Sequence, residues 1–280
     1  MFEMFKLEFI TQAFVLSVLV GIVLAYLGVH VVGRGIVFVD LALGQISSLG
    51  VAFSDYIGYG KTVIPIVFAL LGAILMSLIN IRDRRLKLEA IIGIIYAVAS
   101  AATVMLISKT PHGDSDIQEV LFGNILSVSW EQIRTAGTVL GIIALLHILF
   151  FSKFFNLTKR FEKGEGHAVG IFNLWNFLFY VSIGLCIVFS VRVSGVIPVF
   201  SFLIIPAVGA IMLSKSNLSV VLFALTLSIL GAFFGLYVSF KYDFPAGSSI
   251  VATLGGLFLL VSLFYIFKTM LWSKKSSTSV

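Results

Sequence analysis

The sequence predicts an all-α protein, a polytopic transmembrane helical bundle of about nine spans with its N-terminus outside and its C-terminus inside. Three observations support this prediction. Of the 280 residues, 59% are hydrophobic and 11% are charged, whereas about 25% of the residues of a typical soluble domain are charged. The apolar residues gather in runs of about 20, the length that a helix needs to cross a bilayer. The positive charges lie in short loops between these runs, so the net charge of +6 does not indicate a nucleic-acid partner.

The nine predicted spans follow one another closely and form a single transmembrane domain over residues 1–280. The loop 82–87 carries four Lys and Arg residues, and the positive-inside rule places it in the cytoplasm. Alternation from this loop places 13 of the 19 Lys and Arg residues inside and 6 outside. No signal-peptide pattern precedes the first span, so we expect that span to be retained. The spans are expected near 9–32, 37–56, 62–80, 90–107, 132–152, 173–191, 196–214, 217–239 and 246–267.

The second span carries polar residues inside an apolar run, namely Asp40, Gln45, Ser47 and Ser48. Polar groups in hydrocarbon are costly and often mark a transport pathway, but they also serve as hydrogen-bonding contacts between packed helices. Gln45 and Ser48 share one helix face, and Asp40 lies on another. Arg34 lies in a basic turn just before this span, and alternation places that turn inside. Because Asp40 is close to Arg34 in sequence, an ion pair with Arg34 or a helix cap is an alternative to a substrate role for Asp40.

Two long segments are not expected to span. Residues 108–131, predicted outside, contain Asp114, Asp116 and Glu119 and a half-apolar stretch typical of an interfacial or re-entrant element. Residues 154–170, predicted inside, surround a possible short helix with mixed charge. Apolar residues at both ends of this segment suit docking to a soluble partner. A solvated connecting loop is the alternative for both segments. The charged residues of the second segment are Lys159, Arg160, Glu162, Lys163, Glu165 and His167.

The chain lacks the motifs of an energy-coupling enzyme. It contains no Gly-x-x-x-x-Gly-Lys-Ser/Thr phosphate loop, and its one cysteine, Cys186, excludes a disulfide or a Cys-x-x-Cys site. Its four histidines show no metal-ligand spacing. We therefore expect the chain to bind no cofactor and to form a passive pathway. It is then either the membrane subunit of a transport complex or a stand-alone carrier or channel, with a membrane-embedded enzyme as a distant third possibility.

Five stretches, in order along the chain, resemble the permease subunits of bacterial ABC importers for zinc, manganese and iron. Residues 40–50 are similar to the family's Gly-Asp-Ala-Leu-Ser-His-Ala-Val-Leu-Pro-Gly pattern. Residues 87–94 resemble the acidic start of its next span, and 121–126 resemble Leu-Leu-Phe-Gly-Asn-Ile-Leu. Residues 194–207 resemble its span ending in Leu-Ile-Ile-Pro-Ala, and 239–247 resemble its closing Asp-x-Pro-x-Gly turn.

This resemblance implies a multi-pass permease of the cell (plasma or inner) membrane, paired with a second copy or a paralogue and surrounded by lipid. It also implies an extracytoplasmic solute-binding protein and a cytoplasmic ATPase that binds ATP and docks on residues 153–172. The implied coupling residues are Lys159, Arg160, Glu162, Glu165 and His167.

The chain departs from the family pattern at one pair of positions. Where the family has an Asp and a His four residues apart, this sequence has Leu41 and Gln45. Leu41 offers no ligand and Gln45 offers only an amide, whereas a carboxylate and an imidazole suit a divalent metal ion. The predicted metal path therefore consists of Gln45, Ser48 and water. Asp40 joins this path only if the helix register shifts. A different or chelated solute is the alternative substrate.

Overall fold

The computed structural model describes residues 2–79, 86–109, 123–166, 169 and 173–277. Within these residues it contains helices and no strand, which confirms the predicted all-α class. Along the chain the elements are η1 (Phe2–Lys6), α1 (Glu8–Arg34), α2 (Val39–Ile57), α3 (Val63–Leu78), α4 (Leu88–Ile107), η2 (Ile125–Ser127), α6 (Trp130–Leu149), α7 (Phe151–Glu162), α8 (Leu174–Ser194), α9 (Val196–Leu213), α10 (Asn217–Tyr242) and α11 (Ala246–Ser277).

Each predicted span corresponds to one of these helices, but the count of nine is too high by length and composition. Seven described helices are long and apolar enough to cross a membrane, namely α1, α4, α6, α8, α9, α10 and α11. α3 is apolar but has only 16 residues. α2 is long enough, with 19 residues, but its polar side chains lower its mean hydropathy below that of a membrane-spanning helix.

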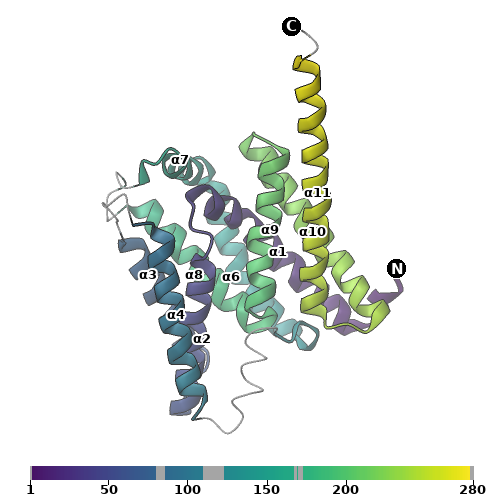
Figure 1. Cartoon of the computed structure of the whole chain (residues 1–280). Helices are drawn as coiled ribbons and strands as arrows, with labels where there is room; N and C mark the ends of the chain where they lie inside the picture. Colours follow the sequence, from purple (N-terminus) through teal and green to yellow (C-terminus); the bar gives the residue numbers. More distant parts are fainter. Residues whose placement is uncertain (1, 80–85, 110–122, 167–168, 170–172, 278–280) are drawn as a thin grey trace.

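α1 is the central helix of the bundle (Figure 1). It packs against α6, α7, α8, α9 and α10. Apolar residues occupy nearly all of its faces, and its buried positions run from Ile10 to Arg34. A helix that is apolar all round is covered either by lipid or by other parts of the protein. Most of the apolar stretch of α1 is buried by other helices, so α1 is the scaffold on which the others are placed.

α2 lies beside this scaffold and contacts α3, α4 and α8. Gly72 of α3 packs directly on Leu43 and Ile46 of α2, and Gly50 of α2 packs on Pro65 and Phe68 of α3. These close approaches leave the Ser47 and Ser48 side of α2 turned toward α8. The polar residues Asp40, Gln45, Ser47 and Ser48 of α2 are thus enclosed by protein.

The structure describes only part of the first segment that was not expected to span, 108–131, and most of the second, 154–170. Asp114, Asp116 and Glu119 lie outside the described residues, and the end of that segment forms the short helix η2, which packs on α1. Residues 154–170 include most of α7, so the predicted short helix is confirmed. In Figure 1, α7 lies on the same side of the bundle as the C-terminal end of α11, in agreement with the side predicted for both.

The crossing of α1 and α9 leads to a stability prediction at Gly28. A Cβ atom added there would clash with the backbone carbonyl of Leu203 and lie 3.1 Å from the Cβ of Ala207. Because α1 and α9 cannot separate without opening the core, Gly28→Ala is expected to destabilise the protein by about 1–3 kcal/mol. The measurement is the thermal unfolding midpoint of the detergent-solubilised chain.

Gly93→Ala is the matched control, since a Cβ on that helical glycine meets no atom within 4 Å. Both substitutions gain the same helix propensity, about 1 kcal/mol, so their difference isolates the clash. Equal midpoints for the two variants would contradict the close approach of α1 to α9 at Gly28.

Candidate translocation path and coupling surface

The polar residues that the sequence singled out on α2 are buried. Asp40 is 3% exposed, Gln45 is 7% exposed and Ser48 is 2% exposed. Unpaired polar groups in such surroundings cost free energy, and the Oδ1 atom of Asp40 has no hydrogen-bond partner. The predicted site residues therefore lie within the bundle, where a path for a polar solute would have to run.

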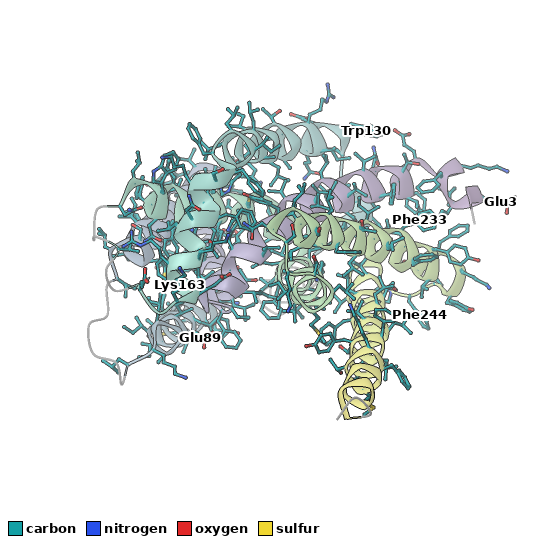
Figure 2. All side chains as sticks on the ribbon, turned by 90° about the horizontal axis from the view of Figure 1, so that it is seen from above. Glu3, Glu89, Trp130, Lys163, Phe233 and Phe244 are labelled. Carbon is teal, nitrogen blue, oxygen red and sulfur yellow. The ribbon has the colours of Figure 1, made fainter. Side chains whose placement is uncertain are left out.

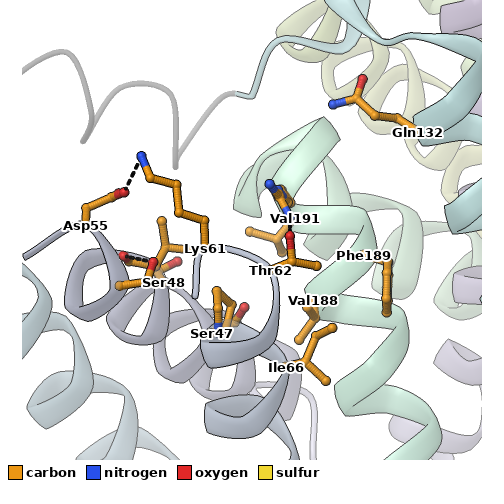
Figure 3. Close-up of a pocket in the computed structure, with 14 residues that line it drawn as sticks. Ser47, Ser48, Asp55, Lys61, Thr62, Ile66, Gln132, Val188, Phe189 and Val191 are labelled. Carbon is orange, nitrogen blue, oxygen red and sulfur yellow. Dashed lines mark hydrogen bonds and ion pairs between the residues drawn. The ribbon is translucent and has the colours of Figure 1, made fainter. Parts of the chain in front are cut away.

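A pocket of about 390 Å³ lies beside α2, between α3 and α8 (Figure 3). Ser47 and Ser48 line it, whereas Gln45 and Asp40 are not among its lining residues. The structure thus brings one predicted path residue, Ser48, into this pocket together with Ser47. Its other polar lining residues, which the sequence did not single out, are Ser54, Asp55, Lys61, Thr62, Gln132 and Arg192.

Charged groups line the pocket near the end of α2. The Lys61 ammonium lies 3.0 Å from the Asp55 carboxylate, and Arg192 donates a hydrogen bond to the hydroxyl of Thr62 at 3.4 Å. Both contacts are partly exposed and are therefore weak. The first contact joins α2 to the turn that follows it, and the second joins that turn to α8.

The ion pair considered between Asp40 and Arg34 is absent, although both residues are described. Arg34 instead donates hydrogen bonds to Thr158 and Asn176, and it is 7% exposed. The sequence placed Arg34 in a cytoplasmic turn, but it is the last residue of α1 and is buried.

The described residues contain no group of three or more His, Cys, Asp or Glu side chains that could hold a metal ion. Hydroxyl and amide oxygens such as those of Ser48 and Gln45 are weak neutral ligands. Such an arrangement suits the passage of a hydrated cation better than its storage.

α7 presents two contrasting faces. Phe154, Phe155, Leu157 and Thr158 are buried against the bundle, whereas the charged residues of the predicted coupling surface are exposed. Of that predicted set, Lys159, Arg160, Glu162 and Glu165 are exposed, and His167 lies outside the described residues. The Nε atom of Arg160 lies 4.0 Å from the Oε2 atom of Glu165. Seen from above, α7 lies across the helices beneath it, with Lys163 at its end (Figure 2).

A buried polar cluster under α7 was not predicted. It joins His30 and Arg34 of α1 to Thr158 of α7 and Asn176 of α8. His147 of α6 lies close by, with its ring 6.3 Å from that of His30. Residues so distant in sequence show no spacing pattern; the one available signal was an arginine flanked by glycines at the end of an apolar span.

The comparison with known proteins now decides the family. Residues 6–265 match the ABC 3 transport family. The chain belongs to that family. A chain of this family with seven candidate membrane-crossing helices is a multi-pass membrane protein.

Similar proteins cover nearly the whole chain. The manganese transport system membrane protein MntC of Listeria monocytogenes is 28% identical over 273 residues, 96% of this chain and 95% of that protein. The manganese import system permease protein ScaB of Streptococcus gordonii is 30% identical over 262 residues, 92% of this chain and 91% of that protein. Among solved structures, PsaBC from Streptococcus pneumoniae in complex with Fab has a TM-score of 0.76 at 28% identity and covers 91% of each chain.

Proposed function

We propose that this ABC 3 family member is the permease subunit of an ATP-driven importer for divalent metal ions, with manganese as the first candidate. The observation that carries the proposal is the near full-length similarity to a manganese transport system membrane protein and a manganese import system permease. The neutral oxygen ligands on α2 support it further, because Mn²⁺ is a hard ion that accepts oxygen ligands.

The proposed path follows the polar face of α2. Ser48 and Ser47 line the pocket beside α8, and Gln45 follows one turn deeper along the same helix. Asp40 is buried near the start of α2, but it lies on a different face of this uninterrupted helix from Gln45 and Ser48 and is therefore not on the proposed path. A second permease, a copy or a paralogue, would complete this path across the dimer axis.

The energy would come from a separate ATPase subunit docked on the exposed face of α7. The chain has no phosphate-binding loop, and α7 offers a charged surface of fixed orientation because its opposite face is buried. ATP binding by that subunit would shift the permease between inward- and outward-open states, since each state would make different contacts with it. A solute-binding protein would deliver the metal ion from outside.

Reconstitution tests this proposal. The purified chain is expected to hydrolyse no ATP, and proteoliposomes that contain it together with its ATPase and binding protein are expected to accumulate manganese only when ATP is supplied. Uptake by the chain alone would contradict the importer and support the stand-alone carrier or channel.

One observation favours a second candidate, an importer of a chelated and therefore anionic metal complex. Lys61 and Arg192 both line the pocket, and Asp55 pairs with only one of them. In the same proteoliposomes, faster uptake of manganese citrate than of free Mn²⁺ would favour this candidate.

A further inference from the structure

Arg34 is a buried cation held without a carboxylate. No Asp or Glu among the described residues forms an ion pair with it. Its guanidinium lies 3.5 Å from the centre of the Phe179 ring. Its Nε donates a hydrogen bond to the Thr158 hydroxyl at 3.3 Å, and its Nη1 donates one to the side-chain oxygen Oδ1 of Asn176 at 3.1 Å. A planar, forked side chain can make all three contacts at once, which an ammonium cannot do.

These contacts connect three helices. Arg34 is the end of α1, Thr158 belongs to the buried face of α7, and Asn176 and Phe179 belong to the first turns of α8. Burying a charge is costly unless hydrogen bonds and stacking offset the lost hydration. The arrangement is therefore stable only while α7 and α8 both stay in place around Arg34.

The contact between α7 and α1 is also unusually close. A Cβ atom at Gly33 would lie 2.7 Å from Cγ2 of Thr158 and 2.8 Å from Oε1 of Glu162, so α7 rests directly on the α1 backbone. One turn earlier, the Nδ1 atom of His30 lies 2.8 Å from the same Thr158 hydroxyl. A single hydroxyl on α7 is thus shared by two buried side chains of α1.

α8 extends from this cluster to the pocket beside α2. Asn176 contacts Arg34, and Val188 and Arg192 of the same helix line the pocket with Ser47 and Ser48. Asn176 and Arg192 are about 24 Å apart along the helix, at a rise of about 1.5 Å per residue. An uninterrupted helix transmits a displacement over that distance with little loss.

We infer that Arg34 is a positioning residue that fastens α7 to α1 and α8, so that a movement of α7 is passed along α8 to the pocket. The inference rests on the proposed function, because the docked ATPase is what moves α7. It adds the route by which that movement reaches the solute. Without the contacts of Arg34, α7 would still move with the ATPase, but this movement would no longer change the shape of the pocket.

Two substitutions of Thr158 separate this role from simple packing. Thr158→Val keeps the shape but removes the hydroxyl, and Thr158→Ser keeps the hydroxyl but removes a methyl group. Fastening through Arg34 and His30 requires the hydroxyl, so only the valine variant is expected to fail. If Thr158 served only in packing, the serine variant, which loses a methyl group, would be the one to fail, and the valine variant would behave like the parent. Arg34→Met is the larger change. Thr226→Val, at an exposed position of α10, is the matched control, since that hydroxyl donates to the Leu222 carbonyl of its own helix.

The first measurement needs no ATPase. Spin labels at Asn156→Cys of α7 and Leu174→Cys of α8, two exposed positions, are placed in a Cys186→Ala background in lipid nanodiscs. The distance distribution is expected to be narrow in the parent, Thr158→Ser and Thr226→Val chains. It is expected to broaden in Thr158→Val and Arg34→Met.

The second measurement is manganese uptake per ATP hydrolysed in the full complex. The loss of hydrogen bonds to a charged group is expected to lower this ratio about tenfold in Thr158→Val, while complex assembly and ATP hydrolysis persist. An unchanged ratio in folded Thr158→Val would overturn the inference, as would a loss in Thr158→Ser equal to that in Thr158→Val. If the unmodified complex transports nothing, the proposed function is wrong, and the distance measurement still shows whether α7 is fastened.

Discussion

The double variant Leu41→Asp, Gln45→His is expected to bind Mn²⁺ or Zn²⁺ about a hundredfold more tightly than the unmodified chain. The two positions are one helical turn apart on α2, so the new carboxylate and imidazole would share a face. Four-ligand zinc sites bind with about 10–16 kcal/mol, or about 3 kcal/mol per ligand. The aspartate adds a ligand where leucine has none, whereas the histidine replaces the Gln45 amide, so we count a net gain of about one ligand, which corresponds to about a hundredfold in affinity. Gln45 is already 7% exposed, so its replacement would place the imidazole inside the bundle.

Equilibrium titration of the detergent-solubilised permease with each metal measures this effect. Leu41→Asn is the matched control, because it adds a polar side chain of similar size without a charge, and it is expected to change the affinity little. Slower release and therefore slower uptake are expected in the double variant, since a tight site holds the ion. If neither metal binds more tightly, Leu41 and Gln45 do not face the path, and the proposed path along α2 loses its main support.

Charge reversal on α7 is expected to uncouple ATP hydrolysis from uptake. Arg160 and Glu165 are exposed on the proposed docking surface and lie within ion-pair distance of each other. Each single reversal, Arg160→Glu or Glu165→Arg, would place like charges opposite each other, both between α7 and the residues just after it and across the proposed interface with the ATPase. Like-charge contacts at an interface cost several kcal/mol, so uptake per ATP is expected to fall about a hundredfold.

The combined variant, Arg160→Glu with Glu165→Arg, separates docking from internal support. It keeps the ion pair with its polarity exchanged but presents the reversed charges to the ATPase, so uptake is expected to stay low. Full recovery in this variant would show that the pair only braces the end of α7. The control is Glu3→Lys with Lys6→Glu, which exchanges an exposed ion pair on η1 and is expected to leave uptake and complex assembly unchanged.

The sequence by itself determined the membrane character, the helices and the family of this protein. These properties are local: each membrane-spanning helix is a run of consecutive apolar residues, and α7 is recognisable as a short segment of mixed charge between two such runs. The order of five motifs along the chain was sufficient to indicate the family, since motif order needs no knowledge of which helices touch. The two spans that fall short, α2 and α3, are those in which polar content or length departs from the apolar pattern.

Only the tertiary structure decided how these helices bring polar side chains together. Ser48 lines the pocket while Gln45, three residues earlier on the same face, does not, because the pocket extends along α2 only from Ser47 to Asp55. Arg34 belongs, by sequence, to a basic turn, and it is buried because α7 and α8 fold over the end of α1. Its partners are 124 and 142 residues away. Contacts over such separations depend on the packing of whole helices, which no local pattern of residues specifies.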